Sequence, residues 1–403
     1  MNLMYIVNRN LRVHLGTLFN MDRLLPLIMS RKICLARGGT LTRFSGIGGA
    51  HHSLLNHHKS GDFPGTELVS VLEYPEQKGA LGKIRHRWIK HPKTVTKFCK
   101  ESLDSDDILH ITDQEQAHLV PKRYHGRPKV LVTVHDLFHM YPYQETISIT
   151  QDGKEQYQQT ISVGNQKPGL VRKYDLKKLI AGLSRADVLI CDSEFTRTVC
   201  EEKFPNVEAV TIPLGLDCEK YVAKNEIPKN SKFEMLFVGS ADPRKRLNFV
   251  AEILQACDSR VKENSVFHIV GDRSSTADKI SETPGFEVTI HQRLDDEQLM
   301  ELRQKCDLLL FPSAAEGYGY PPIESMASGC PVLCANLPAH NELMPENSCL
   351  PAGDISAWVA GINSNFDSWQ ERDSKIPNQE LIEHSKRFSS EVFVKKLNQI
   401  YNF

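Results

Sequence analysis

The sequence lacks long hydrophobic runs. No stretch reaches the roughly eighteen apolar residues that a transmembrane helix needs, and Arg9, Arg12 and Arg23 interrupt the apolar N-terminal region before a secretory core can form. From the sequence we expect a soluble cytoplasmic protein.

An excess of charge of one sign is also missing. The 49 basic and 50 acidic side chains give a formal net charge of -1, so no global field directs the protein towards nucleic acid or anionic lipid. We expect no nucleic-acid partner, and any anionic ligand must be bound by local charges.

The ten cysteines include no C-x-x-C pair and lack the density of a disulfide scaffold. Cys330 and Cys334 are close in sequence, but they lie in a run that predicts a buried strand, with no histidine at ligand spacing. We therefore expect buried thiols in a reducing compartment and no zinc site.

A second cluster of potential metal ligands consists of histidines. Its members are His51, His52, His57 and His58. Neither adjacent pair has the i, i+4 spacing and carboxylate partner of a helical zinc site. We expect these histidines to be solvated helix residues, and the sequence predicts no metal site.

Length and periodicity predict two domains. A chain of 403 residues with 40% hydrophobic residues can bury two cores of roughly 150 to 200 residues each. Strand-like apolar runs alternate with helical segments, which indicates an α/β fold with two doubly wound, mostly parallel sheets. The expected strands are 33–36, 107–111, 130–134 and 186–191 in the first sheet, and 233–239, 266–271, 287–290, 307–311 and 331–334 in the second.

Composition also predicts the domain limits. Residues 1–28 are expected to be an N-terminal extension, 29–217 the first domain, 218–386 the second, and 387–403 an amphipathic closing helix. The polar, lysine-rich stretch 219–232 suits a surface linker. Residues 143–167, rich in Gln and Thr, predict an insertion that forms a hairpin or a mobile loop. Two such sheets facing each other across a cleft would bind a ligand at the carboxyl ends of their strands.

One segment combines a strand, a glycine loop and a helix. The strand at 307–311 leads into EGYGYPPIE at 316–324, with a helix expected to start near Pro321 and to stop at Gly329. Gly317 and Gly319 let a ligand approach the backbone closely, and amides at the helix start suit a phosphate.

Two carboxylates flank this glycine loop. Glu316 is expected in the loop and Glu324 in the first helical turn, so both can face one ligand, and carboxylates accept hydrogen bonds from the paired hydroxyls of a sugar or a ribose. Alternatively, Glu324 only complements the helix dipole and Glu316 is a solvated loop residue. The residues alone leave both interpretations open.

Residues 311–332 resemble the E-x7-E motif region of the family-4 (group 1) glycosyltransferases. The resemblance implies the GT-B fold, in which two Rossmann-like domains face across a cleft. It also implies that Glu316 contacts donor-sugar hydroxyls near the reacting carbon and that Glu324 binds the ribose. The backbone amides that would hold sugar and phosphate are those of Gly317, Tyr318, Gly319 and Tyr320.

Residues 237–245 are similar to the diphosphate-binding turn of the same family. The resemblance places Gly239 in the turn and gives Lys245 the task of neutralising the diphosphate. Ser240 stands where the family often has arginine, and Arg244 is the candidate substitute. From the residues alone, the basic triplet 244–246 is either a phosphate clamp or a solvated helix start, and its unfavourable interaction with the helix dipole favours the clamp.

Two further segments resemble donor-site landmarks. Residues 288–299 are similar to the strand and turn whose backbone contacts the nucleotide base, which places Arg293 and Leu294 near the base. Residues 44–50 resemble the family's first glycine loop, which implies that Gly48 lies under the diphosphate and the acceptor. This loop is not a dinucleotide fingerprint, because the G-x-G-x-x-G pattern fails at His51.

His135 and Asp136 follow a buried strand, at the sheet edge where ligand-binding residues of open sheets lie. The resemblance implies that His135 faces the donor sugar as a hydrogen-bonding partner of sugar or acceptor. Alternatively, neighbouring backbone satisfies this histidine. Asp136 is expected to be structural.

Three aromatic residues follow in the same segment. Phe138, Tyr141 and Tyr143 are candidates for stacking against a sugar, although aromatic residues more often pack in a core.

The resemblance implies a retaining hexosyltransferase that moves a sugar from a nucleoside diphosphate sugar to an acceptor hydroxyl. Glu316, His135 and Lys245 would be the catalytic residues, and no cofactor or metal is expected. The implied acceptor is a glycan or glycolipid of polysaccharide or O-antigen-type lipopolysaccharide assembly, a mannose donor is a weaker expectation, and a peripheral contact with the inner face of the membrane stays open. The alternatives are a nucleotide-sugar epimerase or sugar phosphorylase of the same fold, and a non-catalytic sugar-nucleotide-binding subunit.

Overall fold

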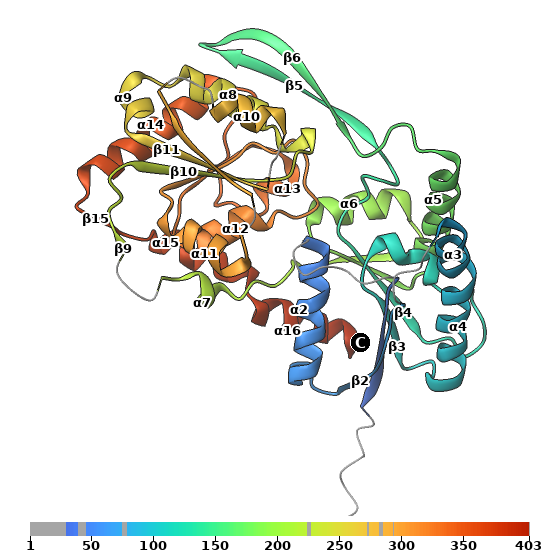
Figure 1. The fold of residues 1–403 in the computed structure, drawn as a ribbon. Coiled ribbons are helices and arrows are strands. Elements are labelled where there is room, and N and C mark those ends of the chain that lie inside the picture. The colour runs from blue at the N-terminus through green and yellow to red at the C-terminus, as the bar shows by residue number, and fades with distance from the viewer. Residues whose placement is uncertain are drawn as a thin grey trace, which may run out of the picture.

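A computed structural model describes residues 30–38, 46–74, 79–223, 227–271, 274–281, 285–292 and 294–402. The expected extension at 1–28 lies outside these residues. Within them, two parallel sheets form two lobes (Figure 1), as the sequence predicted. Every strand expected from the sequence is present.

The first sheet has six strands in the order β2-β1-β3-β4-β7-β8, all paired in parallel. The strands are β1 (Arg31–Ala36), β2 (Thr66–Leu72), β3 (Ile108–Ile111), β4 (Lys129–Val134), β7 (Val188–Cys191) and β8 (Glu208–Thr211). Sequence analysis missed β2 and β8. These two are the edge strands, and their half-exposed residues do not form a continuous apolar run.

Helices cover both faces of this sheet. Helices α4 (His91–Ser102), α5 (Leu170–Leu183) and α6 (Glu194–Lys203) contribute to one apolar cluster, while α2 (Gly46–Ser60) and α16 (Ser390–Tyr401) contribute to the cluster on the other face. Shorter elements are α3 (Ala80–Arg85), the π-helical turn η2 (His86–Lys90) and η3 (Gln114–Leu119).

The second sheet has five parallel strands in the order β12-β11-β10-β13-β14. The strands are β10 (Phe233–Val238), β11 (Ser265–Val270), β12 (Glu287–His291), β13 (Leu308–Phe311) and β14 (Val332–Cys334). Its helices are η4 (Pro243–Lys245), α8 (Leu247–Ala256), α9 (Ser259–Glu263), α10 (Ser275–Ser281), α11 (Asp296–Lys305), α12 (Tyr320–Ala327), α13 (Pro338–Asn341), α14 (Ile355–Glu371), α15 (Gln379–Ser385) and η5 (Lys386–Phe388).

The described residues of 219–232 form more regular structure than a surface linker would. Helix α7 (Cys218–Tyr221) begins it, and β9 (Ile227–Pro228) pairs antiparallel with β15 (Ser374–Lys375). The short pairing fixes the connection to the second lobe.

The insertion expected at 143–167 is a hairpin of β5 (Tyr143–Gln151) and β6 (Lys154–Val163). It leaves the first lobe and lies along the second (Figure 1). Ile147, Ile149 and Ile161 belong to the apolar core cluster of the second sheet, and the Thr150 amide donates to the Gly353 carbonyl at 2.8 Å. The hairpin therefore connects the two lobes through these contacts.

The last helix crosses back to the first lobe. Phe393, Leu397 and Tyr401 of α16 lie in the cluster that covers β1, β3 and β4. Tyr401 is fully buried, and its hydroxyl lies 2.8 Å from Nδ1 of His110. Among the described residues, no helix is both long and apolar enough to cross a membrane.

Candidate functional site

The E-x7-E segment has the expected strand, loop and helix geometry. Strand β13 ends at Phe311, the loop follows, and α12 begins at Tyr320 after its N-cap Gly319, which has φ of 117°. One expectation was wrong: because the helix starts at Tyr320, Glu324 lies in its second turn and not in the first.

Glu316 lies at the centre of a buried cluster of charges. Its carboxylate accepts hydrogen bonds from Lys245 Nζ at 2.5 Å, Arg244 Nη1 at 2.8 Å and Ser313 Oγ at 2.6 Å. Burial opposes ionisation of this side chain, but Lys245 and Arg244 outweigh it and lower the pKa of Glu316 to about 2. The solvated-loop alternative for Glu316 is thus wrong.

The side chains of the basic triplet 244–246 point in two directions. Arg244 and Lys245 both turn towards Glu316, whereas Arg246 is fully buried and points away, with Nη1 donating to the Ala352 carbonyl at 2.6 Å. The backbone of Arg246 itself has a left-handed conformation, with φ of 56°. Two cations of the triplet are therefore placed to meet an anionic ligand.

The rest of the expected diphosphate turn lies beside these cations. Gly239 follows β10, and its amide donates to the Val270 carbonyl at 3.0 Å. A Cβ at Gly239 would lie 3.4 Å from the Cβ of Lys245. Ser240 is exposed, so Arg244 supplies the second positive charge near Glu316.

Glu324 faces a separate pair of partners. Its carboxylate accepts from the Tyr221 hydroxyl at 3.1 Å and pairs with Arg303, which is almost fully buried. Glu324 is thus held by side chains of α7 and α11, away from the Glu316 cluster.

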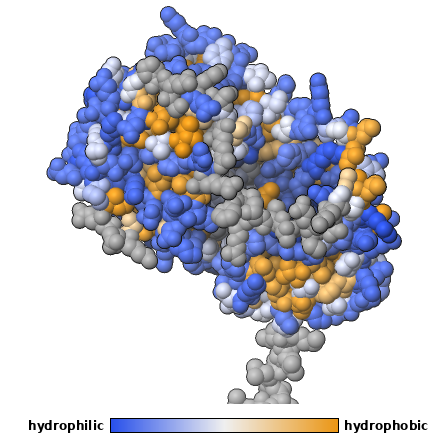
Figure 2. Space-filling model, in the orientation of Figure 1, coloured by the Kyte–Doolittle hydropathy of each residue, from blue (hydrophilic) through white to orange (hydrophobic). Residues whose placement is uncertain are grey.

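The glycine loop also touches the first lobe. A Cβ at Gly317 would lie 1.9 Å from the His135 carbonyl oxygen, so only glycine permits this approach. Ser193 Oγ donates to the Gly317 carbonyl at 2.7 Å, and the Tyr318 hydroxyl donates to the Leu214 carbonyl at 2.8 Å. The two lobes meet at this loop. Figure 2 shows the two lobes side by side, in the orientation of Figure 1.

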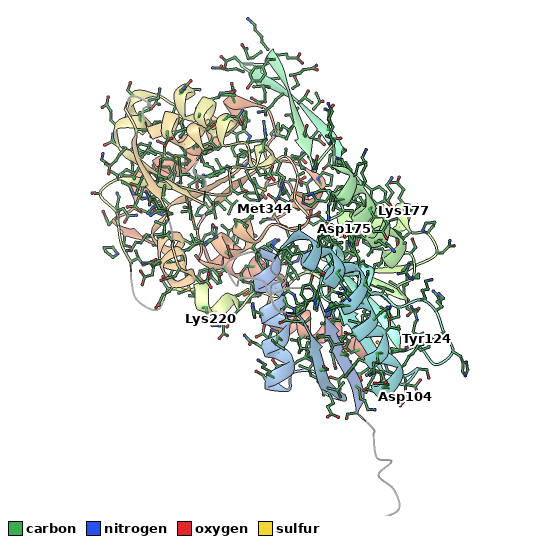
Figure 3. The ribbon with its side chains drawn as sticks, turned by 45° about the vertical axis from the view of Figure 1, so that its right-hand side comes forward. Asp104, Tyr124, Asp175, Lys177, Lys220 and Met344 are labelled. Carbon is green, nitrogen blue, oxygen red and sulfur yellow. The ribbon has the colours of Figure 1, made fainter. Side chains whose placement is uncertain are left out.

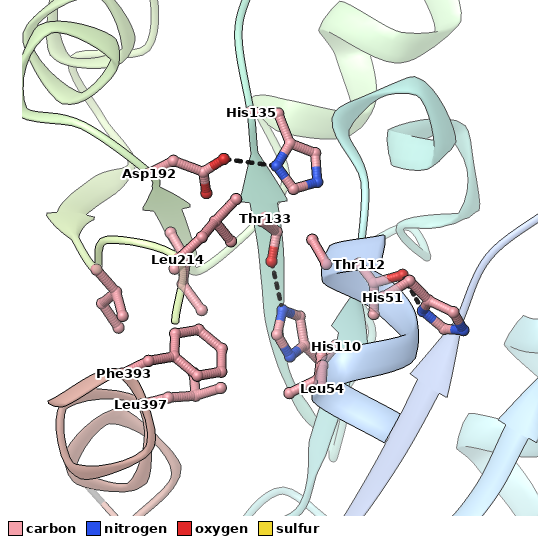
Figure 4. Close-up of a pocket in the computed structure, with 13 residues that line it drawn as sticks. His51, Leu54, His110, Thr112, Thr133, His135, Asp192, Leu214, Phe393 and Leu397 are labelled. Carbon is pink, nitrogen blue, oxygen red and sulfur yellow. Dashed lines mark hydrogen bonds and ion pairs between the residues drawn. The ribbon is translucent and has the colours of Figure 1, made fainter. Parts of the chain in front are cut away.

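His135 forms an ion pair that the sequence analysis missed. Its Nδ1 lies 2.6 Å from Oδ2 of Asp192, and both residues are buried (Figure 4). Burial alone would lower the pKa of His135, but Asp192 outweighs it and raises this pKa to about 9. Burial raises the pKa of Asp192, while the adjacent imidazolium opposes that shift, and we expect the pair to be ionised at neutral pH. The sequence did show that Asp192 directly follows the buried strand β7, at the sheet edge where ligand-binding residues lie.

A small cavity of about 20 Å³ lies behind this pair. His135, Asp192, His110 and Thr133 line its polar side, and Phe393 and Leu397 of α16 line its apolar side (Figure 4). The cavity has room for about one water molecule.

Two expectations for the first glycine motif were wrong. Gly48 is buried within α2 and not in a loop, because the helix already begins at Gly46. His51 is also buried and not solvated; its Nδ1 contacts Thr112 Oγ1 at 3.0 Å. The remainder of the motif, 44–45, lies outside the described residues.

An aromatic cavity of about 550 Å³ opens in the first lobe beside the site. Phe138, Tyr141 and Tyr143 contribute to its lining, as does Lys203. The Arg244 guanidinium lies 5.8 Å from the ring centroid of Phe138, which connects this cavity to the Glu316 cluster. Asp136 accepts from the Phe138 amide at 3.0 Å and so shapes the local turn.

The base-contacting turn is described only in part. Leu294 is half-buried against the apolar cluster that also contains Tyr318 and Ile323. Arg293 lies outside the described residues.

One group of potential metal ligands occurs among the described residues. Ligand atoms of Glu234, His268 and Cys306 lie within 4.8 Å of one another. Glu234 is the second residue of β10 and Cys306 precedes β13, whereas the Glu316 loop follows the carboxyl end of β13. This group takes no part in the Glu316 site.

These features indicate the kind of ligand that the site can bind. A buried carboxylate between two cations, at a helix start and at the junction of two parallel sheets, suits a ligand that combines phosphate with a polyol. Residues 218–381 match the family of Glycosyl transferases group 1. The second lobe is therefore similar to the group 1 glycosyltransferases, and the chain has the GT-B fold.

Individual proteins are similar over different lengths. O-antigen chain mannosyltransferase B of Escherichia coli is 25% identical over 238 residues, covering 54% of this chain and 61% of that protein. The serotype-specific mannosyltransferase WbdA of Escherichia coli is 23% identical over 199 residues, covering 46% of this chain and 24% of that protein. The alignments thus span less than two thirds of either relative.

Among solved structures, HepE of Anabaena in complex with UDP and glucose superposes with a TM-score of 0.63. The match covers 92% of this chain and 99% of that one at 16% sequence identity. At this identity the likeness shows the shared fold alone.

Proposed function

We propose that this protein is a retaining glycosyltransferase that moves a hexose from a nucleoside diphosphate sugar to an acceptor hydroxyl. The observation that carries this proposal is Glu316, buried and ionised between Lys245 and Arg244 in the loop that leads into α12. The family match of the second lobe supports it. The mannosyltransferase relatives suggest mannose as the sugar and polysaccharide or O-antigen-type assembly as the setting.

The charges of the cluster explain how a donor would bind. Before binding, Glu316 neutralises Lys245 and Arg244. A diphosphate has more negative charge and would take over both cations, together with the amides at the start of α12. The carboxylate of Glu316 is then released to accept hydrogen bonds from the sugar hydroxyls.

The chemical step follows from this arrangement. The acceptor oxygen bonds to the anomeric carbon as the bond from that carbon to the diphosphate oxygen breaks, and the acceptor proton passes to the departing phosphate. Lys245 and Arg244 stabilise the negative charge that develops on the phosphate. We expect this electrostatic stabilisation to be the largest contribution to the rate. No metal is needed in this scheme, because the two side chains supply the positive charge.

His135 contributes as a hydrogen-bond donor. With its pKa raised to about 9 by Asp192, the imidazole carries both protons at neutral pH and is unsuited to act as a base. Its Nε2 has no hydrogen-bonding partner among the described residues. We assign this atom to a hydroxyl of sugar or acceptor, and Asp192 is the residue that positions it.

We place the acceptor at the aromatic cavity of the first lobe. Phe138, Tyr141 and Tyr143 offer faces on which a sugar ring can stack. We also propose that the first lobe, 29–217, binds the acceptor and that the second, 218–386, binds the nucleotide sugar, with Leu294 and Arg293 near the base and Glu324 at the ribose. We further propose that the enzyme works in the cytoplasm.

The structure offers less support to a non-catalytic subunit. That alternative depended on the missing arginine at Ser240, and Arg244 restores a second cation 2.8 Å from Glu316. Transfer or donor hydrolysis by the purified chain would exclude it.

The donor is tested first by thermal shift with GDP-, UDP- and ADP-sugars, because a ligand that binds only the folded state raises the melting temperature. We expect the largest shift with GDP-mannose. Turnover then tests the site: Glu316→Gln should lower kcat by at least about 100-fold. The matched control is Glu263→Gln, which changes an exposed glutamate of α9. Equal turnover of the two variants would refute the assignment.

A further inference from the structure

Exposed apolar side chains gather on one part of the first lobe. Eight large apolar side chains are exposed among the described residues, and five of them lie on α3, η2 and the first turns of α5. These five are Leu81 (83% exposed), Leu170 (84%), Val171 (60%), Ile89 (49%) and Tyr174 (47%). We call α3, η2, α4 and 167–178 the docking face.

The docking face is one continuous surface. The rings of Trp88 and Tyr174 pack 4.7 Å apart, and Asp175 accepts from Arg87 Nε and Trp88 Nε1, each at 2.8 Å. These contacts hold the first turns of α5 against η2. Apolar atoms project at the right-hand edge of Figure 2, over α5 and α3, and Figure 3 turns this side forward, with Asp175 and Lys177 labelled.

The same face carries a local excess of positive charge. The docking face contains twelve lysines and arginines but only two acidic residues, Glu101 and Asp175, in a chain whose net charge is -1. Glu101 lies 3.8 Å from Lys97. Asp175 is buried and is already bonded to Arg87 and Arg172. Arg85, Lys90 and Lys93 are exposed, as are the lysines 167, 173, 177 and 178.

We propose that the docking face binds the surface of an anionic membrane. Helices with protruding aliphatic side chains surrounded by lysines are typical of interfacial binding, because the apolar groups enter the headgroup region while the lysines attract anionic lipids. The same face of a second copy does not fit this surface, since it would bring a second set of twelve cations against the first. This proposal is independent of the transfer reaction, although a glycolipid acceptor would be held in the membrane reached in this way.

The test is sedimentation of the full chain with vesicles. Phosphatidylcholine vesicles are compared with vesicles that also contain phosphatidylglycerol, at low and high salt. We expect binding to the anionic vesicles alone, and weaker binding as salt screens the lysines. The triple variant Lys90→Gln, Lys93→Gln, Lys173→Gln should weaken the partition coefficient by roughly 100-fold, because each lysine near an anionic surface contributes about fivefold.

The apolar contribution is tested separately. Leu81→Ser, Leu170→Ser and Val171→Ser together should abolish most of the vesicle binding. The matched control, Val222→Ser with Ile376→Ser, changes exposed apolar residues outside the docking face and should leave binding unchanged. Thermal shift with the nucleotide sugar should be the same for all variants, which separates failure of this proposal from failure of the donor site.

Three results would overturn the proposal. They are vesicle binding that neither triple variant reduces, equal binding to neutral and anionic vesicles, and binding of nucleic acid without binding to vesicles.

Discussion

The buried pair of His135 and Asp192 leads to a pH-dependent prediction. Replacing Asp192 with asparagine keeps the size of the side chain but removes the charge that holds the imidazolium. Without the carboxylate of Asp192, which is the main interaction that raises the pKa of His135, burial lowers this pKa. We expect His135 to be neutral at pH 7 in this variant.

The pair affects stability because the pKa of His135 is higher in the folded state, about 9, than its ordinary value of 6.5. A raised pKa adds stability that is fully present below the unfolded value and is lost as pH rises through the folded value. For a change from 6.5 to 9 the contribution is roughly 3 kcal/mol. Between pH 6.5 and 9 the wild-type protein should lose about this amount, and Asp192→Asn should not.

The assay is chemical denaturation at a series of pH values from 6 to 9.5. The matched control is Asp187→Asn, at the other end of the same strand. Its carboxylate pairs with Arg127 and not with a histidine, so the control should keep the wild-type slope with pH. A wild-type slope that Asp192→Asn leaves unchanged would refute the ion pair. Turnover gives a second readout: we expect at least about a tenfold loss for Asp192→Asn, since its histidine no longer donates from a fixed position.

Three further predictions concern other parts of the site and fold. Gly317→Ala places a Cβ 1.9 Å from the His135 carbonyl and should lower turnover by about 100-fold, whereas Gly82→Ala, which meets no atom within 4 Å, should have no effect; equal activities would contradict the close approach. Ile149→Ala should cost about 2 to 5 kcal/mol in the free energy of unfolding, because this residue of the hairpin is fully buried in the second lobe, and the exposed Thr146→Ala on the same strand should cost little by comparison. Incubation with a chelator followed by its removal should leave turnover unchanged, and activity that only added Mg²⁺ or Mn²⁺ restores would disprove the metal-free scheme.

Much of the fold was predictable because its signals are local. The central strands are continuous apolar runs, which is what burial on both faces of a parallel sheet requires. The edge strands β2 and β8 lack that signal, since only part of their surface is covered. The hairpin was recognisable from its polar composition, but its packing against the second lobe depends on contacts with residues about 100 or more positions away.

The site was predictable as a set of residue types but not as a geometry. The motif indicated that Glu316, Arg244 and Lys245 have a role, while the pairing of both cations with one carboxylate appears only in the folded chain. Arg246 belongs to the same basic triplet and points the other way; it has a left-handed backbone conformation between η4 and α8. Asp192 was overlooked, since a single aspartate after a strand has no spacing that identifies its partner.

The contacts between the lobes suggest how donor binding and catalysis are coupled. The carboxylate of Glu342 in the second lobe accepts from the amides of Glu194 and Phe195 at 2.6 and 2.7 Å, and so caps the start of α6 in the first lobe. With the Ser193 contact to Gly317, this cap joins the lobes directly beside His135 and Glu316. The hairpin joins them again at a distance through Ile149 and Gly353. Because the lobes are tied at both places, any opening that admits a donor must break the cap or bend the hairpin.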